Sequence, residues 1–196
     1  MSLLKPSAVL AIAVLVCAPV VAHARDQAQQ TGAPQGMPPS PKPGPEHAIF
    51  NEDAGTWDAV VEFFAAPGQP PMTSKGVETN TIGCGGLCLI TDFKGEMTGT
   101  SFHGHGISTW DVAKKKYVGV WTDSMSQGLG ISEGTWDAAT RTMSGYMEGP
   151  DMSGQVTKIK SVGEYKKDGT RVMTMYSPAS AGKETPTMRI TYTRKK

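Results

Sequence analysis

The chain has few charged and few aromatic residues, and no net charge once its first segment is set aside. Of 196 residues, 19% are charged and 7% are aromatic, which excludes a coiled coil and a long charged tail. Residues 25–196 carry 18 basic side chains, one fewer than the 19 of the whole chain, against 18 acidic ones. A balance near zero argues against nucleic acid or an anionic membrane surface as the main partner.

Several motifs that carry chemistry are also missing. The sequence has no Gly-x-Ser-x-Gly elbow, no phosphate-binding loop and no dinucleotide fingerprint. Beyond one short turn, no window holds a helical apolar stripe for three turns, so alternating βαβ units are excluded. After residue 24 no apolar run approaches the length of a membrane span.

The first 24 residues have the three parts of a secretory signal. Met1–Lys5 is short and positive, Ala8–Val21 is apolar, and Ala22-His23-Ala24 is a small-x-small cleavage site. We expect cleavage after Ala24 and export to the periplasm or the medium. A lipoprotein acylated at Cys17 is the weaker alternative, because Val16 stands where a small residue is expected.

Residues 25–45 lack periodicity and contain six prolines, which predicts a disordered, semi-stiff linker. We therefore expect residues 46–196 to form one domain. After a helical turn around Pro45–Glu52, extended runs alternate with turn residues (Gly, Pro and Asp) about every 8 to 14 residues. We expect ten strands, near 56–65, 72–82, 87–95, 100–110, 116–124, 129–137, 142–148, 155–165, 170–177 and 186–194.

An open sheet of so many short antiparallel strands would have unpaired edge strands, and closure of the sheet into a barrel removes these edges completely. The prediction is an all-β fold, a single antiparallel meander barrel of about eight to ten strands. A β-sandwich is the alternative. Thr-Trp-Asp occurs three times, and its copies at 109–111 and 135–137 both end strands and enter similar turns, as hairpin chemistry explains.

Several segments resemble the bacterial domain-of-unknown-function family 1579. They span the whole domain in order: Pro43-Gly44-Pro45-Glu46-His47, Ala54-Gly55-Thr56-Trp57-Asp58, Pro71 to Thr79, Trp121-Thr122-Asp123-Ser124-Met125, Glu133-Gly134-Thr135-Trp136-Asp137 and Thr191 to Lys195.

The resemblance implies a lipocalin-like barrel but no activity. It also implies structural roles for Gly55 and Trp57 on the first strand and for Arg194 on the last, with the guanidinium covering the indole face. This chain departs from the family pattern at Cys84 and Cys88.

Cys84 and Cys88 are the candidate disulfide, because an exported protein meets an oxidising compartment. A continuous strand would hold them about 13 Å apart, beyond bridging range. A three-residue turn over 85–87 would bring them opposite each other, whereas a two-residue turn would forbid the bond. Free or redox-active thiols remain the alternative. The pair falls short of the four ligands of a zinc site.

His103 and His105 are two residues apart, so on a strand both imidazoles share a face. If a turn over 112–114 places His103 opposite Asp123 and His105 opposite Trp121, and the next hairpin brings Glu133 close, these side chains gather. Such a set could bind a divalent metal or act as acid and base. A slip of one residue would send half of it to the other face.

Three functions remain open at this point. The first is a binding barrel for a small apolar or amphipathic ligand, whose cavity or core the scattered methionines would line. The second is a metal protein or enzyme that uses His103, His105, Asp123 and Glu133. The third is an envelope interaction protein with a filled barrel. The sequence identifies no ligand, metal, cofactor or oligomeric state.

Overall fold

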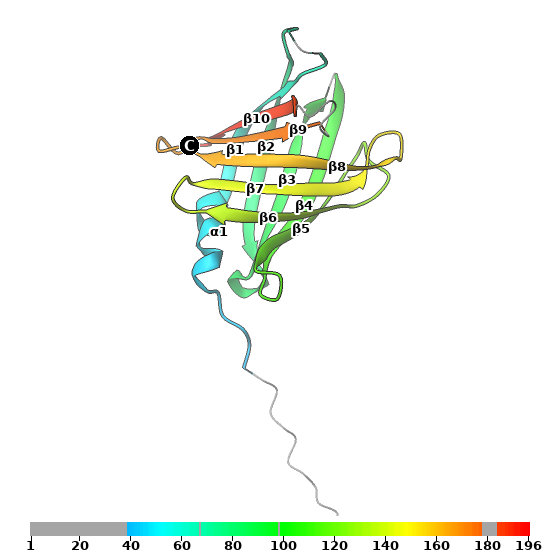
Figure 1. Cartoon of the computed structure of the whole chain (residues 1–196). Coiled ribbons are helices and arrows are strands. Elements are labelled where there is room, and N and C mark those ends of the chain that lie inside the picture. Colours follow the sequence, from blue (N-terminus) through cyan, green and yellow to red (C-terminus); the bar gives the residue numbers. More distant parts are fainter. Residues whose placement is uncertain (1–38, 67, 98, 178–183) are drawn as a thin grey trace, which may run out of the picture. The chain divides into compact units, whose positions relative to one another are not determined.

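The computed structural model describes residues 39–196 except 67, 98 and 178–183, and these residues form an all-β barrel (Figure 1). The expected signal peptide at 1–24 lies outside the described residues, as does the linker at 25–45 up to residue 38. Within the described ranges, no helix combines the length and the hydrophobicity needed to cross a bilayer.

The ten expected strands are all confirmed, and so is the helical turn before them. The helical turn consists of a 3-10 helix at Pro45–His47 and α1 at Ala48–Asp53. The strands are β1 Gly55–Phe63, β2 Met72–Gly83, β3 Cys88–Met97, β4 Thr100–Asp111, β5 Lys116–Asp123, β6 Gly130–Asp137, β7 Thr142–Pro150, β8 Val156–Tyr165, β9 Arg171–Tyr176 and β10 Pro186–Arg194.

The strands form a closed antiparallel meander in which each pairs with its neighbours in sequence and β1 pairs with β10. The closing register runs from Trp57 opposite Arg194 to Phe63 opposite Met188. This confirms the barrel rather than the sandwich, and none of the described strands is left with an unpaired edge. In Figure 1 α1 lies at one end of the barrel.

The period-two pattern of each strand fixes which side chains face the interior. On β1, Trp57, Ala59 and Val61 are buried, while Asp58 and Val60 between them are exposed. One core cluster groups these β1 residues with side chains of β3, β4 and β10. A second lies under α1, where Ile49, Phe50, Leu89 and Tyr117 pack together.

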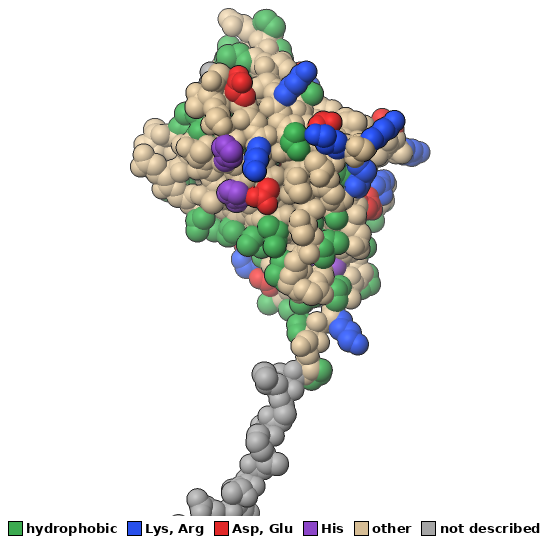
Figure 2. All heavy atoms as spheres, turned by 180° about the vertical axis from the view of Figure 1, so that it is seen from behind, with side chains coloured by type: hydrophobic (Ala, Val, Ile, Leu, Met, Phe, Trp, Pro, Cys, Tyr) green, Lys and Arg blue, Asp and Glu red, His purple; other side chains and the backbone are tan. Residues whose placement is uncertain are grey.

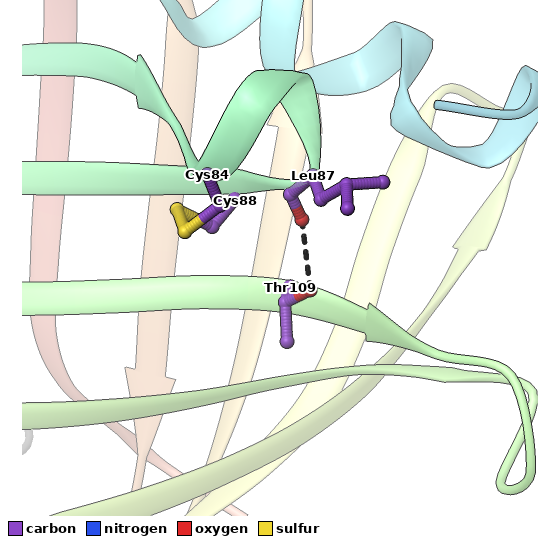
Figure 3. The surroundings of a disulfide bond; sticks show 4 residues. All are labelled: Cys84, Leu87, Cys88 and Thr109. Carbon is purple, nitrogen blue, oxygen red and sulfur yellow. Dashed lines mark hydrogen bonds between the residues drawn. A yellow bond between two sulfur atoms is a disulfide. The ribbon is translucent and has the colours of Figure 1, made fainter. Parts of the chain in front are cut away.

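The predicted disulfide joins Cys84 and Cys88, whose Cα atoms are 5.5 Å apart (Figure 3). The three-residue turn that would place the cysteines directly opposite each other does not form, because the strand partner of Cys88 is Gly83. Cys84 is the first residue of a four-residue turn and has a φ of 53°, which brings its side chain back toward β3. A hydrogen bond links this turn to β4: the Thr109 hydroxyl donates to the Leu87 carbonyl oxygen at 2.8 Å.

Replacing both cysteines with alanine should lower the free energy of unfolding by about 2 kcal/mol, because a loop this short constrains the unfolded chain only modestly. Urea unfolding with and without dithiothreitol measures the effect. The reductant should shift the midpoint of the parent protein and leave the double variant unchanged. An equal shift in both proteins would contradict a stabilising disulfide.

Candidate functional site

The interior of the barrel is hollow, with a cavity of about 570 Å³. This volume lies within the usual range of small-molecule sites. The cavity extends from Ile49 and Phe50 of α1 to Met125 and Met152 in the loops after β5 and β7. Its wall is mainly methionine, aromatic and small residues, among them Met143, Met147, Met173, Met175, Met188, Phe63, Phe93, Phe102, Trp121, Gly106, Gly134 and Gly145.

Glycines on the inner faces of the strands let large side chains lie flat against the wall. On β4, the inward positions Gly104 and Gly106 are covered by the indole of Trp121 from β5. A Cβ atom at Gly104 would lie 2.2 Å from Trp121 Cζ2, so any larger residue would push the indole inward. The glycines therefore help to keep the centre of the barrel free.

A buried ion cluster forms the polar floor of the cavity beside α1. Arg171, the first residue of β9, donates from Nη1 to Asp53 Oδ1 and from Nη2 to Glu78 Oε1, both at 2.7 Å. All three side chains are at most 12% exposed. The Arg171 guanidinium also packs against two rings, 4.1 Å from the centre of Trp57 and 4.6 Å from that of Tyr192.

This environment changes the proton affinity of the groups in the cluster. Burial raises the pKa of Asp53 above its ordinary value, against the opposing effect of Arg171. Burial lowers the pKa of Arg171, but the charges of Asp53 and Glu78 more than offset this, so that the pKa is raised overall. Burial and the nearby Asp53 hold the pKa of Tyr165 well above its usual range. Arg171 therefore keeps its charge at any physiological pH.

Hydrogen bonds extend the ion cluster on both sides. Tyr165 donates its hydroxyl proton to Asp53 Oδ2 at 2.9 Å. Asn80 donates to Glu78 Oε1 at 2.7 Å and to the Asp53 carbonyl at 3.2 Å, and it accepts from Thr91 at 2.7 Å. Buried polar groups joined in this way hold each other in fixed positions.

Of the predicted site residues, Trp121 and Asp123 face the cavity together. The Trp121 indole donates to Asp123 Oδ2 at 2.9 Å. Asp123 Oδ1 also accepts from the backbone amides of Met125 and Ser126, both at 2.8 Å. Asp123 thus orders the loop after β5 and fixes the orientation of the indole.

The predicted gathering of His103, His105, Asp123 and Glu133 is wrong, because the β4–β5 register differs by one residue. Gly104, not His103, is opposite Asp123, and Thr122, not Trp121, is opposite His105. Both histidines therefore lie on the outer face. No group of three or more His, Cys, Asp or Glu suited to a metal ion occurs among the described residues.

On the outer face, His105 Nδ1 is 2.6 Å from Asp92 Oδ1, and His103 Nε2 is 3.1 Å from the Ser101 hydroxyl. Figure 2 shows histidine side chains on the surface of the molecule, beside basic and acidic side chains. Glu133 is half-buried and borders the cavity, and its carboxylate pairs with the ammonium groups of Lys114 and Lys116. The two histidines thus occupy exposed positions, and they and Glu133 each have local polar partners.

The residues expected to close the barrel lie together at the end near α1. Arg194 Cζ is 4.3 Å from the centre of the Trp57 ring, and its Nη atoms donate to the carbonyls of Glu52 and Ala54, both at 2.8 Å. Gly55 has a φ of 122°, and a Cβ there would lie 2.6 Å from Arg194 Nη1. Only glycine leaves room for this arrangement.

The sequence interpretation missed the ion cluster of Asp53, Glu78 and Arg171. A signal for it was present in the alternation of β9, where Arg171 shares the inner face with Met173 and Met175. Glu78 likewise follows Gly76 by two residues on β2. A charge in phase with apolar or small residues indicates an inward ionic group.

Comparison with known proteins identifies a family for this chain. No curated protein matches the chain. The model of the family described as "Protein of unknown function (DUF1579)" matches residues 42–194, from the segment before α1 to the end of β10. The chain therefore belongs to this family, as the resemblance of its segments indicated.

Proposed function

We propose that the protein is exported and binds a small apolar or amphipathic molecule inside its barrel. The observation that carries the proposal is the cavity of about 570 Å³ with its mainly apolar wall. Burial of apolar surface drives association with such a wall, and a few convergent polar groups orient the ligand. The ion cluster at the floor supplies groups of this kind.

Methionine suits a wall that receives molecules of varied shape. Its unbranched thioether side chain adapts to irregular surfaces at low cost. Met143, Met147, Met173 and Met175 all line the cavity from β7 and β9. The cavity also argues against an interaction protein with a filled barrel. Because His103 and His105 lie on the outer face, the main argument for a metal protein is lost.

Export is supported by the sequence pattern at residues 1–24 and by the disulfide between Cys84 and Cys88. Disulfides persist mainly in oxidising compartments. Expression of the full chain with an epitope after Lys196, followed by fractionation and mass measurement, tests this part. The mature protein should begin near Arg25 and leave the cytoplasm. A cytoplasmic chain of full mass would refute it.

Native mass spectrometry of mature protein, compared with its denatured mass, tests ligand binding. A removable excess with the mass of an organic molecule is expected if the ligand survives purification. Protein stripped of ligand should then bind the uncharged probe phenylnaphthylamine, whose fluorescence rises in apolar surroundings. Failure to take up this or any other apolar probe would refute the proposal.

Filling the cavity should weaken binding. Ser161 lies on the inner face of β8 opposite Gly145, and Ser161→Leu is expected to raise the dissociation constant of the probe about tenfold. Ser144 of β7 points outward, so Ser144→Leu adds the same side chain without entering the cavity. Equal affinities of the two variants, measured by fluorescence titration, would place the probe outside the barrel.

A further inference from the structure

Among the described residues that line the cavity, Arg171 is the single basic one, and its guanidinium is already bound to two carboxylates of the protein. Arg171 gives its two terminal nitrogens to Asp53 and Glu78. The rings of Trp57 and Tyr192 pack against it, and its Nε is buried without a hydrogen-bond partner. Three of its five N–H donors make no bond to these carboxylates, but the side chain is only 11% exposed, so little of the guanidinium is open to the carboxylate of a ligand.

Acidic groups outnumber this cation on the inner surface. Asp53 and Glu78 lie at the floor, and Asp123 faces the interior beside Trp121. These three carboxylates and the guanidinium together carry a formal charge of −2. The other charged residues that border the cavity in the described part of the chain, Glu96, Glu133, Asp151 and Glu164, are all acidic. Inside an apolar wall the field of such charges is screened much less than in water.

Uncharged polar groups are also available along the wall. The hydroxyl oxygens of Ser108 and Ser132 lie over Gly119, where a Cβ would be 2.8 and 2.9 Å from them. Both serines line the cavity, on β4 and β6. Each hydroxyl can accept a hydrogen bond from a ligand hydroxyl or amine, or donate one to a ligand hydroxyl.

From this arrangement we infer that the cavity rejects anionic head groups and takes amphiphiles whose polar end is uncharged or cationic. A fatty-acid carboxylate would approach Asp53 and Glu78 with no free cation to pair with. An alcohol can use the serine hydroxyls, and an amine gains from the excess of negative charge. The inference rests on the proposed function and names the ligand class for the same cavity.

The test compares dodecanol, dodecylamine and dodecanoate as competitors of bound phenylnaphthylamine at neutral pH and low salt, below the concentrations at which they form micelles. The three share one apolar chain and differ in head-group charge. Dodecanol and dodecylamine should displace the probe at concentrations about tenfold or more below that of dodecanoate. Equal or tighter binding of dodecanoate overturns the inference but keeps the proposed function. Failure of all three, together with the probe, overturns both.

A matched pair of variants locates the source of the discrimination. Asp53→Asn removes one floor charge at nearly constant shape, whereas Asp58→Asn removes a charge from the exposed face of β1. D53N should reduce the discrimination against dodecanoate several-fold, and D58N should leave it unchanged. Equal discrimination in D53N and the parent overturns the role of the floor. If D53N does not fold, the comparison of head groups on the parent protein still decides the inference.

Discussion

Replacing Arg171 with methionine is expected to lower the free energy of unfolding by about 3–5 kcal/mol. The change leaves Asp53 and Glu78 buried, close together and without their shared cation. It also removes the guanidinium from the rings of Trp57 and Tyr192. Urea unfolding followed by circular dichroism measures the loss. Methionine keeps much of the apolar volume, so the loss reports mainly on charge and hydrogen bonds.

Arg189→Met is the matched control. Arg189 lies on the outer face of β10, 42% exposed and 3.9 Å from Glu62, so its removal should cost less than about 1 kcal/mol. Equal losses in the two variants would contradict the role of the buried cluster. If R171M is too unstable to purify, adding Asp53→Asn and Glu78→Gln should restore folding, since no buried charge then lacks a partner.

The strands could be predicted because each carries its own local signals. On β1 the alternation of Trp57, Ala59 and Val61 with polar neighbours marks both the strand and its inner face. Turn residues mark where one strand ends and the next begins. In a meander each strand pairs with the next, so the order of strands follows directly from the order of the sequence.

The register was harder to predict than the strands, because a turn that is one residue longer or shorter changes which residues pair. The β4–β5 turn holds four residues, 112–115, between the paired Asp111 and Lys116. Asp111 Oδ1 accepts from the amides of Ala113 and Lys114, and Lys115 adopts a φ of 52°. Lysine is not typical of a left-handed conformation, so the sequence did not indicate that Lys115 belongs to the turn. A three-residue turn over 112–114 was therefore equally compatible with the sequence.

The Thr-Trp-Asp copy at 135–137 builds the same turn as the copy at 109–111, and this similarity was a usable signal for the turn length. Asp137 accepts from the amides of Ala139 and Thr140, and Arg141 has a φ of 53°. Alternation could place Arg171 and Glu78 on inner faces, but local patterns could not show that they pair with each other and with Asp53. The cluster joins α1, β2 and β9, which are far apart in sequence and meet only when β1 closes against β10.

Replacing Trp57 with alanine is the second change expected to have a large effect, with a loss of about 3–5 kcal/mol in the free energy of unfolding. The side chain is 2% exposed, and its indole donates to the Asp53 carbonyl at 2.8 Å. The guanidinium groups of Arg171 and Arg194 both pack against its ring. Truncation therefore opens a void, removes the aromatic contact of Arg194 and leaves Arg171 only the ring of Tyr192.

Trp121→Ala provides the contrast that separates stability from binding. Trp121 is only partly buried and lies along the cavity wall over Gly104, so its loss should cost about 1 kcal/mol. It should instead weaken binding of phenylnaphthylamine, because one apolar wall of the site disappears. Thermal unfolding and probe titration of both variants distinguish the two roles. If Trp121→Ala destabilises the protein as much as Trp57→Ala and leaves binding unchanged, the indole belongs to the structural core, and the ligand must lie elsewhere in the barrel.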